Sequence, residues 1–383
     1  MSNKKLTVLG IVAVFMVMWA VVQSQVSDIS EAKPQGPAPL IQGLNTADID
    51  SISLGKGEDA VVLRRKQGRF VVAGKDDYPA KVSQINDLIS KCLTIQTTEF
   101  VTDNPANHED LGVTEEKASS VVKFFRPDSN LLTGVIGGNA KELGEGNYVR
   151  LATSDAVYVT PSMPWISGSA MGFIEQELIT MKAEDIESVT VNSGDGEYML
   201  KPTEGNGVMM EKIPVGKKLK TADARAVLTA LTSLRCEDVK KKPDNLLFNK
   251  QYFCKLKDST VYSIEIAHEM DKTYITCGAV FTDTAPVTVG SETESEEELK
   301  KKEAKLLAHE NAVKFANKHR GWVYEIADYK AKNLTKKLSD LLEDEEKPQE
   351  QNEPEPAAES TPDNAAETMT EEIEGPRPEE SNL

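Results

Sequence analysis

Two stretches of the chain share one pattern of apolar and polar positions. "ADIDSISL" at residues 47–54 and "EDIESVTV" at residues 184–191 both place an isoleucine between two acids, then alternate apolar with small polar residues. Such alternation is typical of a half-buried β-strand. Because the pattern returns after 137 residues, it indicates that the chain contains the same structural unit twice.

The same order of predicted elements follows each stretch. In the first copy, "DSISL", "AVVLRR" and "RFVVAG" predict three strands, and Pro79 then begins a helix, where the fixed φ of proline is tolerated. In the second copy, "ESVTV", "EYMLKP" and "GVMMEKI" predict three strands, and Thr221 caps a helix. The expected apolar helix faces are Val82, Ile85, Leu88, Ile89, Cys92 and Leu93 in the first copy, and Ala224, Val227, Leu228, Leu231 and Leu234 in the second.

Short strands separated by turns follow each helix. They are "SVVKFF", "LTGVIGG", "NYVRLA" and "AVYVTP" in the first copy, and "YFCKLK", "VYSIEIAH", "TYITCGAV" and "GWVYEIA" in the second. We expect "GFIEQELI" to close the first copy as a short helix and "LTKKLSDLL" to take its place in the second. The predicted fold is therefore α+β: a tandem duplication, over residues 44–180 and 181–343, of a mixed, mostly antiparallel β-sheet unit with a packed helix.

The second copy carries an insertion at residues 284–320. Its "SEEELKKKEAKLLAHENAVKFANK" predicts a charged helix with an apolar stripe. The first copy has only short turns at this place, so the shared fold does not require the insertion. We therefore expect the insertion to be a better candidate for contact with a partner than the acidic C-terminal segment. The stripe consists of Ala304, Leu307, Ala308, Ala312 and Phe315.

The N-terminus predicts a membrane anchor. Lys4 and Lys5 precede 17 uncharged residues, Leu6 to Val22, and positive residues before such a run favour a cytoplasmic N-terminus. We expect residues 1–5 in the cytoplasm, a transmembrane helix at 6–24, a linker at 25–43, and the remaining chain in the periplasm. A signal peptide cleaved after Ser24 is the alternative.

The charge is concentrated at the other end. From Glu343 onward there are 15 acidic and two basic residues, a net charge of −13, whereas the rest of the chain has 42 basic and 47 acidic residues, a net charge of −5. A nearly neutral body does not indicate nucleic-acid binding. The Glu- and Pro-rich segment 344–383 is expected to be disordered.

The residues that could carry chemistry form no recognisable catalytic, cofactor or metal motif. The four histidines are scattered, "HEMDK" lacks the second histidine of a zinc motif, and no Gly-x-Ser-x-Gly elbow of a hydrolase is present. The acid pairs Asp48/Asp50 and Asp185/Glu187 recur at strand starts, which favours turn and solvent-facing roles. We therefore predict no catalytic, cofactor or metal residues and no enzymatic activity, with surface histidines at His108, His268, His309 and His319.

Two other residue types allow two readings each. An oxidising compartment permits disulfides between the cysteines, but their spacing does not require them. We expect free, buried thiols: Cys254 would lie opposite Ser263 and Cys277 opposite Ile264, so the two would point to opposite sides of the sheet, and Cys92 and Cys236 lie on apolar helical faces in different halves. The lysine clusters either contact anionic lipids or an acidic partner, or form a solvated surface. These clusters are Lys217, Lys218 and Lys220, and Lys240, Lys241 and Lys242.

Four short motifs in a fixed order resemble the domain-of-unknown-function family numbered 4340. They are Leu111-Gly112-Val113, Ile136-Gly137, Tyr148-Val149-Arg150 and Val157-Tyr158, with Leu-Gly-Val in place of the commoner Leu-Gly-Leu. The resemblance covers roughly residues 44–200 well and the second copy more loosely.

The resemblance implies a bacterial inner-membrane protein without known enzymatic activity. Such proteins are often encoded beside ABC transporters of the gliding-motility type, whose subunits are the implied partners. We therefore expect a non-enzymatic, membrane-anchored accessory or interaction subunit of such a complex. The alternative is a stand-alone periplasmic module that binds a glycan or another envelope ligand.

Overall fold

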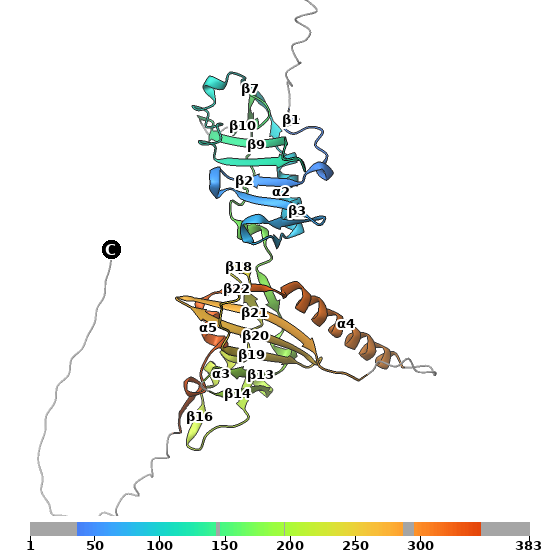
Figure 1. Ribbon diagram of the computed structural model, residues 1–383, viewed down its shortest axis with the longest axis vertical. Coiled ribbons are helices and arrows are strands. Elements are labelled where there is room, and N and C mark those ends of the chain that lie inside the picture. The colour runs from blue at the N-terminus through green and yellow to red at the C-terminus, as the bar shows by residue number, and fades with distance from the viewer. Residues whose placement is uncertain (1–36, 143–145, 195, 286–294, 346–383) are drawn as a thin grey trace, which may run out of the picture. The chain divides into compact units, whose positions relative to one another are not determined.

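The computed structural model describes residues 37–142, 146–194, 196–285 and 295–345. It has an α+β fold of mostly antiparallel sheets (Figure 1), which confirms the fold class. All described residues up to Asp344 belong to one compact unit. The expected anchor at 6–24 lies outside the described residues, as does nearly all of the tail. No helix within the described ranges is both long and apolar enough to cross a membrane.

The first large sheet has nine strands in the order β5-β4-β3-β2-β8-β9-β10-β11-β7. Alternate burial along β2 and β3 follows from the alternating sequence, which places Ile52, Leu54 and Leu63 in the core. The strands are β2 Ser51–Leu54, β3 Val61–Lys66, β4 Arg69–Val72, β5 Tyr78–Pro79, β7 Glu99–Thr102, β8 Ser120–Phe125, β9 Leu131–Ala140, β10 Asn147–Leu151 and β11 Val157–Thr160.

The second large sheet has eight strands in the order β15-β14-β13-β19-β20-β21-β22-β18. Its long central hairpin, β20 with β21, turns at Met270 and Asp271, where Glu269 pairs with Lys272. The strands are β13 Ile186–Asn192, β14 Glu197–Thr203, β15 Gly207–Met210, β18 Asp238–Lys241, β19 Lys250–Leu256, β20 Thr260–Glu269, β21 Lys272–Phe281 and β22 Trp322–Ile326.

Three two-stranded pairs and four α-helices complete the described fold. The pairs are β1 Ala38–Pro39 with β6 Gln96–Thr97, β12 Glu177–Thr180 with β17 Ser233–Arg235, and β16 Lys217–Leu219 with β23 Leu342–Asp344. The α-helices are α2 Val82–Leu93, α3 Thr221–Leu228, α4 Glu296–His319 and α5 Asp328–Leu334, with short 3-10 helices at η1 Thr46–Asp48, η6 Ala170–Phe173, η7 Ala183–Asp185 and η9 Leu338–Leu341 among others.

The two large sheets have corresponding strand orders. The first sheet reads β4-β3-β2-β8-β9-β10-β11-β7 and the second reads β15-β14-β13-β19-β20-β21-β22-β18. Strands at the same position in the two sheets come in the same order along the chain. The helices α2 and α3 follow β4 and β15 in the chain, and the pairs β1–β6 and β12–β17 occupy corresponding places as well. The first sheet alone has an additional edge strand, β5, which pairs with β4.

Several predicted elements differ from the structure. The predicted helix "GFIEQELI" is wrong, because η6 ends at Phe173 and the buried pair Leu178–Ile179 lies in β12. The second helix ends at Leu228 rather than continuing through Leu234, which lies in β17. Its end coincides with Thr229, whose hydroxyl donates to Arg225 O; such a local hydrogen bond competes with helix propagation.

Both ends of the body also differ from expectation. "LTKKLSDLL" does not form one helix, because α5 ends at Leu334 and η9 begins at Leu338. Within the predicted linker, Ala38–Pro39 forms β1, and the next two residues, Leu40 and Ile41, are buried. The first helix begins at Val82, three residues after Pro79, which lies in β5.

The four cysteines are free and buried, but the predicted register around Cys254 is wrong by one residue. Cys254 pairs with Tyr262, because the β19–β20 turn is centred on Asp258 and has Ser259 at φ +71°. Cys277 pairs with Ile264 as expected. Tyr262 and Ile264 face the same side of the sheet, so both thiols do too. They lie two strands apart, about 10 Å, which is beyond disulfide reach.

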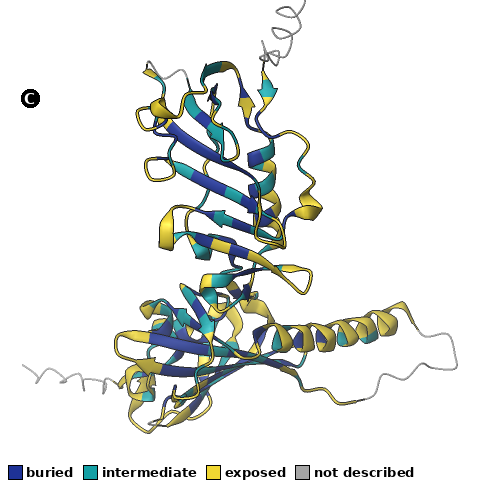
Figure 2. Ribbon diagram, turned by 45° about the horizontal axis from the view of Figure 1, so that its top comes forward, coloured by how far each residue is buried: buried dark blue, intermediate teal, exposed yellow. Residues whose placement is uncertain are grey.

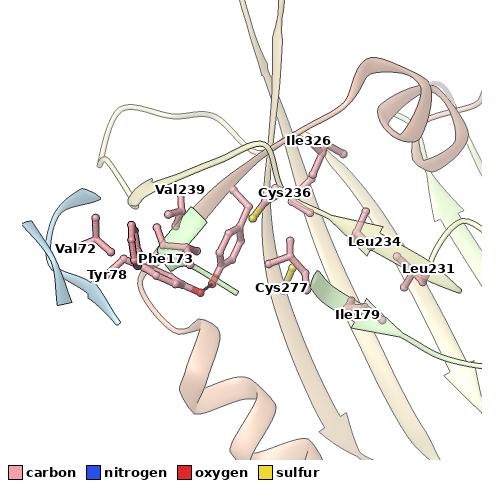
Figure 3. Packing of buried hydrophobic residues seen from close by; sticks show 14 of the residues in the cluster. Val72, Tyr78, Phe173, Ile179, Leu231, Leu234, Cys236, Val239, Cys277 and Ile326 are labelled. Carbon is pink, nitrogen blue, oxygen red and sulfur yellow. Dashed lines mark hydrogen bonds between the residues drawn. The ribbon is translucent and has the colours of Figure 1, made fainter. Parts of the chain in front are cut away.

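A single hydrophobic cluster continues from the first large sheet into the second. Figure 2 shows buried strands in both sheets, and Figure 3 shows Val72 and Tyr78 at the junction, with Phe173 and Val239 beside Tyr78. Because Tyr78 and Val239 lie far apart in sequence, this contact is long-range. Burial of apolar area across the junction therefore joins the two sheets into one packed body.

Candidate functional site

The junction between the sheets contains a chain of buried polar groups. Tyr78 stacks edge-on against Trp322, with ring centroids 4.8 Å apart, and its hydroxyl lies 3.4 Å from that of Tyr324. The Tyr324 hydroxyl lies 2.7 Å from Nδ1 of His319 at the end of α4. The first sheet, the second sheet and the inserted helix thus meet at three contiguous side chains.

Among the three side chains Tyr78, Tyr324 and His319, only His319 ordinarily ionises near neutral pH. It is 2% exposed, and its Nε2 has no hydrogen-bond partner among the residues that the structure describes. Burial, with a smaller contribution from Lys318, lowers the pKa of His319 to about 4, because the charged imidazolium loses its hydration. The side chain is therefore neutral at pH 7.

Two charged contacts border the junction. Lys75 Nζ lies 2.6 Å from Asp238 Oδ1, and the backbone N–H of Lys241 donates to Asp76 Oδ2 over 2.9 Å. Lys75 and Asp76 belong to the turn between β4 and β5, while Asp238 and Lys241 belong to β18. These contacts fix the edge of one sheet against the edge of the other.

The sequence predicted that all four histidines lie on the surface, and the structure shows that this prediction is wrong for His108 and His319. His108 is 5% exposed, and its Nε2 lies 2.9 Å from Asp155 O. His268 is exposed and lies 2.8 Å from Thr273 Oγ1 through Nδ1, whereas His309 packs against Phe281. The burial of His108 and His319 could not be predicted from the sequence, because neither residue belongs to a local pattern that requires burial.

The lysine clusters are largely paired. Lys217 and Lys218 form ion pairs with Asp344 and Glu343 of β23, at 2.6 and 3.4 Å, and Lys220 Nζ donates to Asp340 O. Lys217 and Lys218 therefore join β16 to β23, whereas Lys220 contacts η9. At exposed positions such ion pairs contribute little.

The second cluster lies over aromatic rings. Lys240 Nζ is 3.9 Å from the centre of the Tyr274 ring, and Lys242 Nζ is 4.4 Å from that of Phe248. Lys242 also lies 3.5 Å from Glu265. Cation–π contacts of this kind stabilise the fold modestly.

The acid pairs lie at the starts of β2 and β13. Asp48 and Asp185 are exposed in η1 and η7, and Glu187 forms an ion pair with Lys255 at 2.7 Å. Within the described ranges, no group of three or more His, Cys, Asp or Glu residues is arranged to hold a metal ion.

The motif residues of the first sheet form one packing unit. Gly112 has φ +68°, and a Cβ added there would lie 2.5 Å from Asn139 Oδ1. Arg150 Nε donates to Val113 O over 2.7 Å, and Asn139 N donates to Leu111 O. A Cβ on Gly138 would lie 2.4 Å from Leu111 O. The loop at 108–113 thus docks on β9 and β10 only because glycines permit close approach.

The inserted helix α4 has two different faces. Ser295 and Glu298 form a capping box at its start, which stabilises the first turn. Ala308 and Ala312 are buried, and Phe315 stacks edge-on against Tyr262 of β20, with centroids 5.0 Å apart. Other apolar residues of α4 are about half exposed: Leu299, Leu306, Leu307 and Val313.

Comparison with known proteins finds one matching family model. The family described as Domain of unknown function (DUF4340) matches residues 71–251, a range that begins in β4 and ends in β19 and includes Tyr78 but not Trp322, Tyr324 or His319. No curated protein matches the chain, and no solved structure matches it. Residues 71–251 of this chain thus match the family model DUF4340, a domain of unknown function, which confirms the resemblance seen in the sequence.

Proposed function

We propose that this chain is a non-enzymatic interaction subunit of the bacterial envelope. In this proposal residues 6–24 anchor it in the inner membrane, the body lies outside the cytoplasm, and the partner is a subunit of a gliding-motility-type ABC transporter. The uncharged run after Lys4 and Lys5 supports the anchor and its orientation.

The observation that carries the proposal is the outer face of α4. Leu299, Leu306 and Val313 are seven residues apart, so at 100° per residue they lie within about 40° of one another around the helix. Ala308 lies about 200° from Leu306, on the side that packs against the sheet. The helix therefore presents an apolar stripe opposite its packed face, with exposures of 53%, 57% and 46% for the three residues.

An apolar stripe on a projecting helix is suited to a partner's hydrophobic groove. Helices that bind in this way use anchors at spacings of three, four and seven residues. Among the described residues, only the second sheet carries an α-helix between consecutive paired strands, namely α4 between β21 and β22. A helix that the first sheet lacks is not needed for the sheet order that both share, which favours a specific role in binding.

The test is co-purification from solubilised membranes with Leu306→Lys. Because Leu306 is 57% exposed, the substitution should change the free energy of unfolding by less than ~0.5 kcal/mol, yet reduce recovery of transporter subunits at least tenfold. Leu247→Lys is the matched control, since Leu247 is 80% exposed and lies outside α4. Equal recovery by both variants would refute the role of α4. Retention of a glycan with no protein partner would favour the ligand-binding alternative.

We also infer that the body arose by tandem duplication of one unit. The shared strand order supports this, as do Ile49 and Ile186, which follow η1 and η7, are fully buried and donate their N–H groups back to Thr46 O and Ala183 O. The test is a pairwise sequence comparison within many family members. Matching internal similarity at these positions is expected, and its consistent absence would contradict the inference.

A further inference from the structure

The outer edge of β15 is uncovered, although the corresponding edge of the first sheet is covered. In the first sheet, β4 is followed in the chain by β5, which folds back and pairs with it, Val72 with Tyr78. In the second sheet, β15 is followed by β16, but β16 pairs with β23 instead. Within the described residues, β15 therefore ends the sheet.

The register shows which backbone groups this edge offers. Glu211 N donates to Met199 O at the end of the β14–β15 pair, and Met209 pairs with Lys201 two positions earlier. In an antiparallel pair, bonded and non-bonded positions alternate. Met209 therefore bonds inward, whereas Val208 and Met210 direct their N–H and C=O groups toward the open edge.

A cleft of about 450 Å³ lies where β15 ends, between the start of β14 and the residues that follow Met210. Its lining includes Met199, Met210, Ile213 and Pro214, and its charged residues are Glu197, Glu211 and Lys212. Ile213 is 43% exposed and Met209 is 49% exposed. Backbone donors and acceptors next to apolar walls are the two requirements of strand addition, in which the ladder gives affinity and pockets select side chains.

We propose that β15 and its cleft bind an extended segment of a partner polypeptide as an additional strand. The chain itself shows the kind of occupant: in the first sheet the equivalent edge holds a short extended segment whose aromatic residue, Tyr78, is 3% exposed. The bound segment places apolar residues against Met209 and Ile213, which are both nearly half exposed, and basic residues near Glu197. This site is separate from α4, so it is independent of the proposed role of that helix.

The test uses a labelled peptide, Lys-Val-Thr-Val-Thr-Val-Lys, titrated with the full-length chain in detergent and followed by fluorescence anisotropy. Val208→Pro removes an outward donor but no bond to β14, so it should weaken binding at least tenfold; it also removes core contacts of the partly buried Val208 side chain, which should lower Tm. Met209→Pro removes an inward bond and should lower Tm through the β14–β15 pair. Should Val208→Pro fail to fold, Ile213→Asp, which alters only the cleft, should weaken binding by a similar factor.

Peptide binding that is lost in Val208→Pro or Ile213→Asp supports the proposal. Absence of binding to the wild-type chain, or equal binding by wild type and variants, would overturn it. Sedimentation of the chain without peptide tests the other occupant: dimerisation that Val208→Pro abolishes would mean that a second copy, not a partner segment, covers this edge.

Discussion

Replacing Tyr78 by alanine tests whether the two sheets form one cooperative body. The side chain is 3% exposed and contacts Trp322 and Tyr324 of the other sheet. Truncating a buried aromatic residue to alanine costs about 3–5 kcal/mol. Tyr78→Ala should therefore lower the free energy of unfolding by about that amount.

The contributions to this loss can be separated. The hydroxyl contact with Tyr324 is long, at 3.4 Å, so Tyr78→Phe should cost only ~1 kcal/mol or less. The edge-on pair with Trp322 should give a coupling energy of about 0.5–1.5 kcal/mol in a double-mutant cycle. Tyr329→Ala is the control, because Tyr329 is 65% exposed.

The assay is urea unfolding of the full-length chain, followed by far-UV circular dichroism and tryptophan fluorescence. Coincident transitions are expected for the wild type, since one hydrophobic cluster spans both sheets. A loss below ~1 kcal/mol in Tyr78→Ala, against the ~3–5 kcal/mol of a packed aromatic, would refute the view that this junction holds the body together.

Two further predictions concern single residues. His319 has a pKa of about 4 in the folded chain and 6.5 ordinarily, so below pH 6.5 the unfolded state takes up a proton that the folded state does not. The free energy of unfolding should therefore fall between pH 6.5 and 4, by ~2 kcal/mol at pH 5. Urea unfolding at pH 7 and pH 5 measures this loss, and His319→Gln should remove it. An unchanged pH dependence in the variant would contradict the burial of a neutral imidazole. In Gly112→Ala, φ is +68° and the new Cβ would lie 2.5 Å from Asn139 Oδ1. Its Tm should therefore fall further than that of Gly68→Ala, where φ is +79° and the new Cβ would meet no described atom within 4 Å beyond its chain neighbours. Equal losses would mean that Asn139 moves aside freely.

Periodicity predicted those elements whose burial follows a local pattern. Ile85, Leu88 and Cys92 are the buried residues of α2, and α4 spans nearly the residues expected for the charged helix. These predictions worked because helical spacing places apolar residues on one face without reference to the remaining fold.

The differences arose where one residue or a distant contact decides the structure. Ser259 at positive φ shifts the register of Cys254 by one position, which reverses the face that a strand residue occupies. The junction was not predictable, because the contacts of Tyr78 lie 244 and 246 residues away, at Trp322 and Tyr324. The open edge of β15 was also not predictable, because it depends on β16 pairing with the distant β23 rather than with β15.

The most direct test of the proposed function is the set of proteins that co-purify with the full-length chain from solubilised bacterial membranes, identified by mass spectrometry. Subunits of an ABC transporter of the gliding-motility type should be recovered with the wild-type chain, and they should be depleted with Leu306→Lys but not with Leu247→Lys. Recovery of the chain without any transporter subunit would contradict the proposed function.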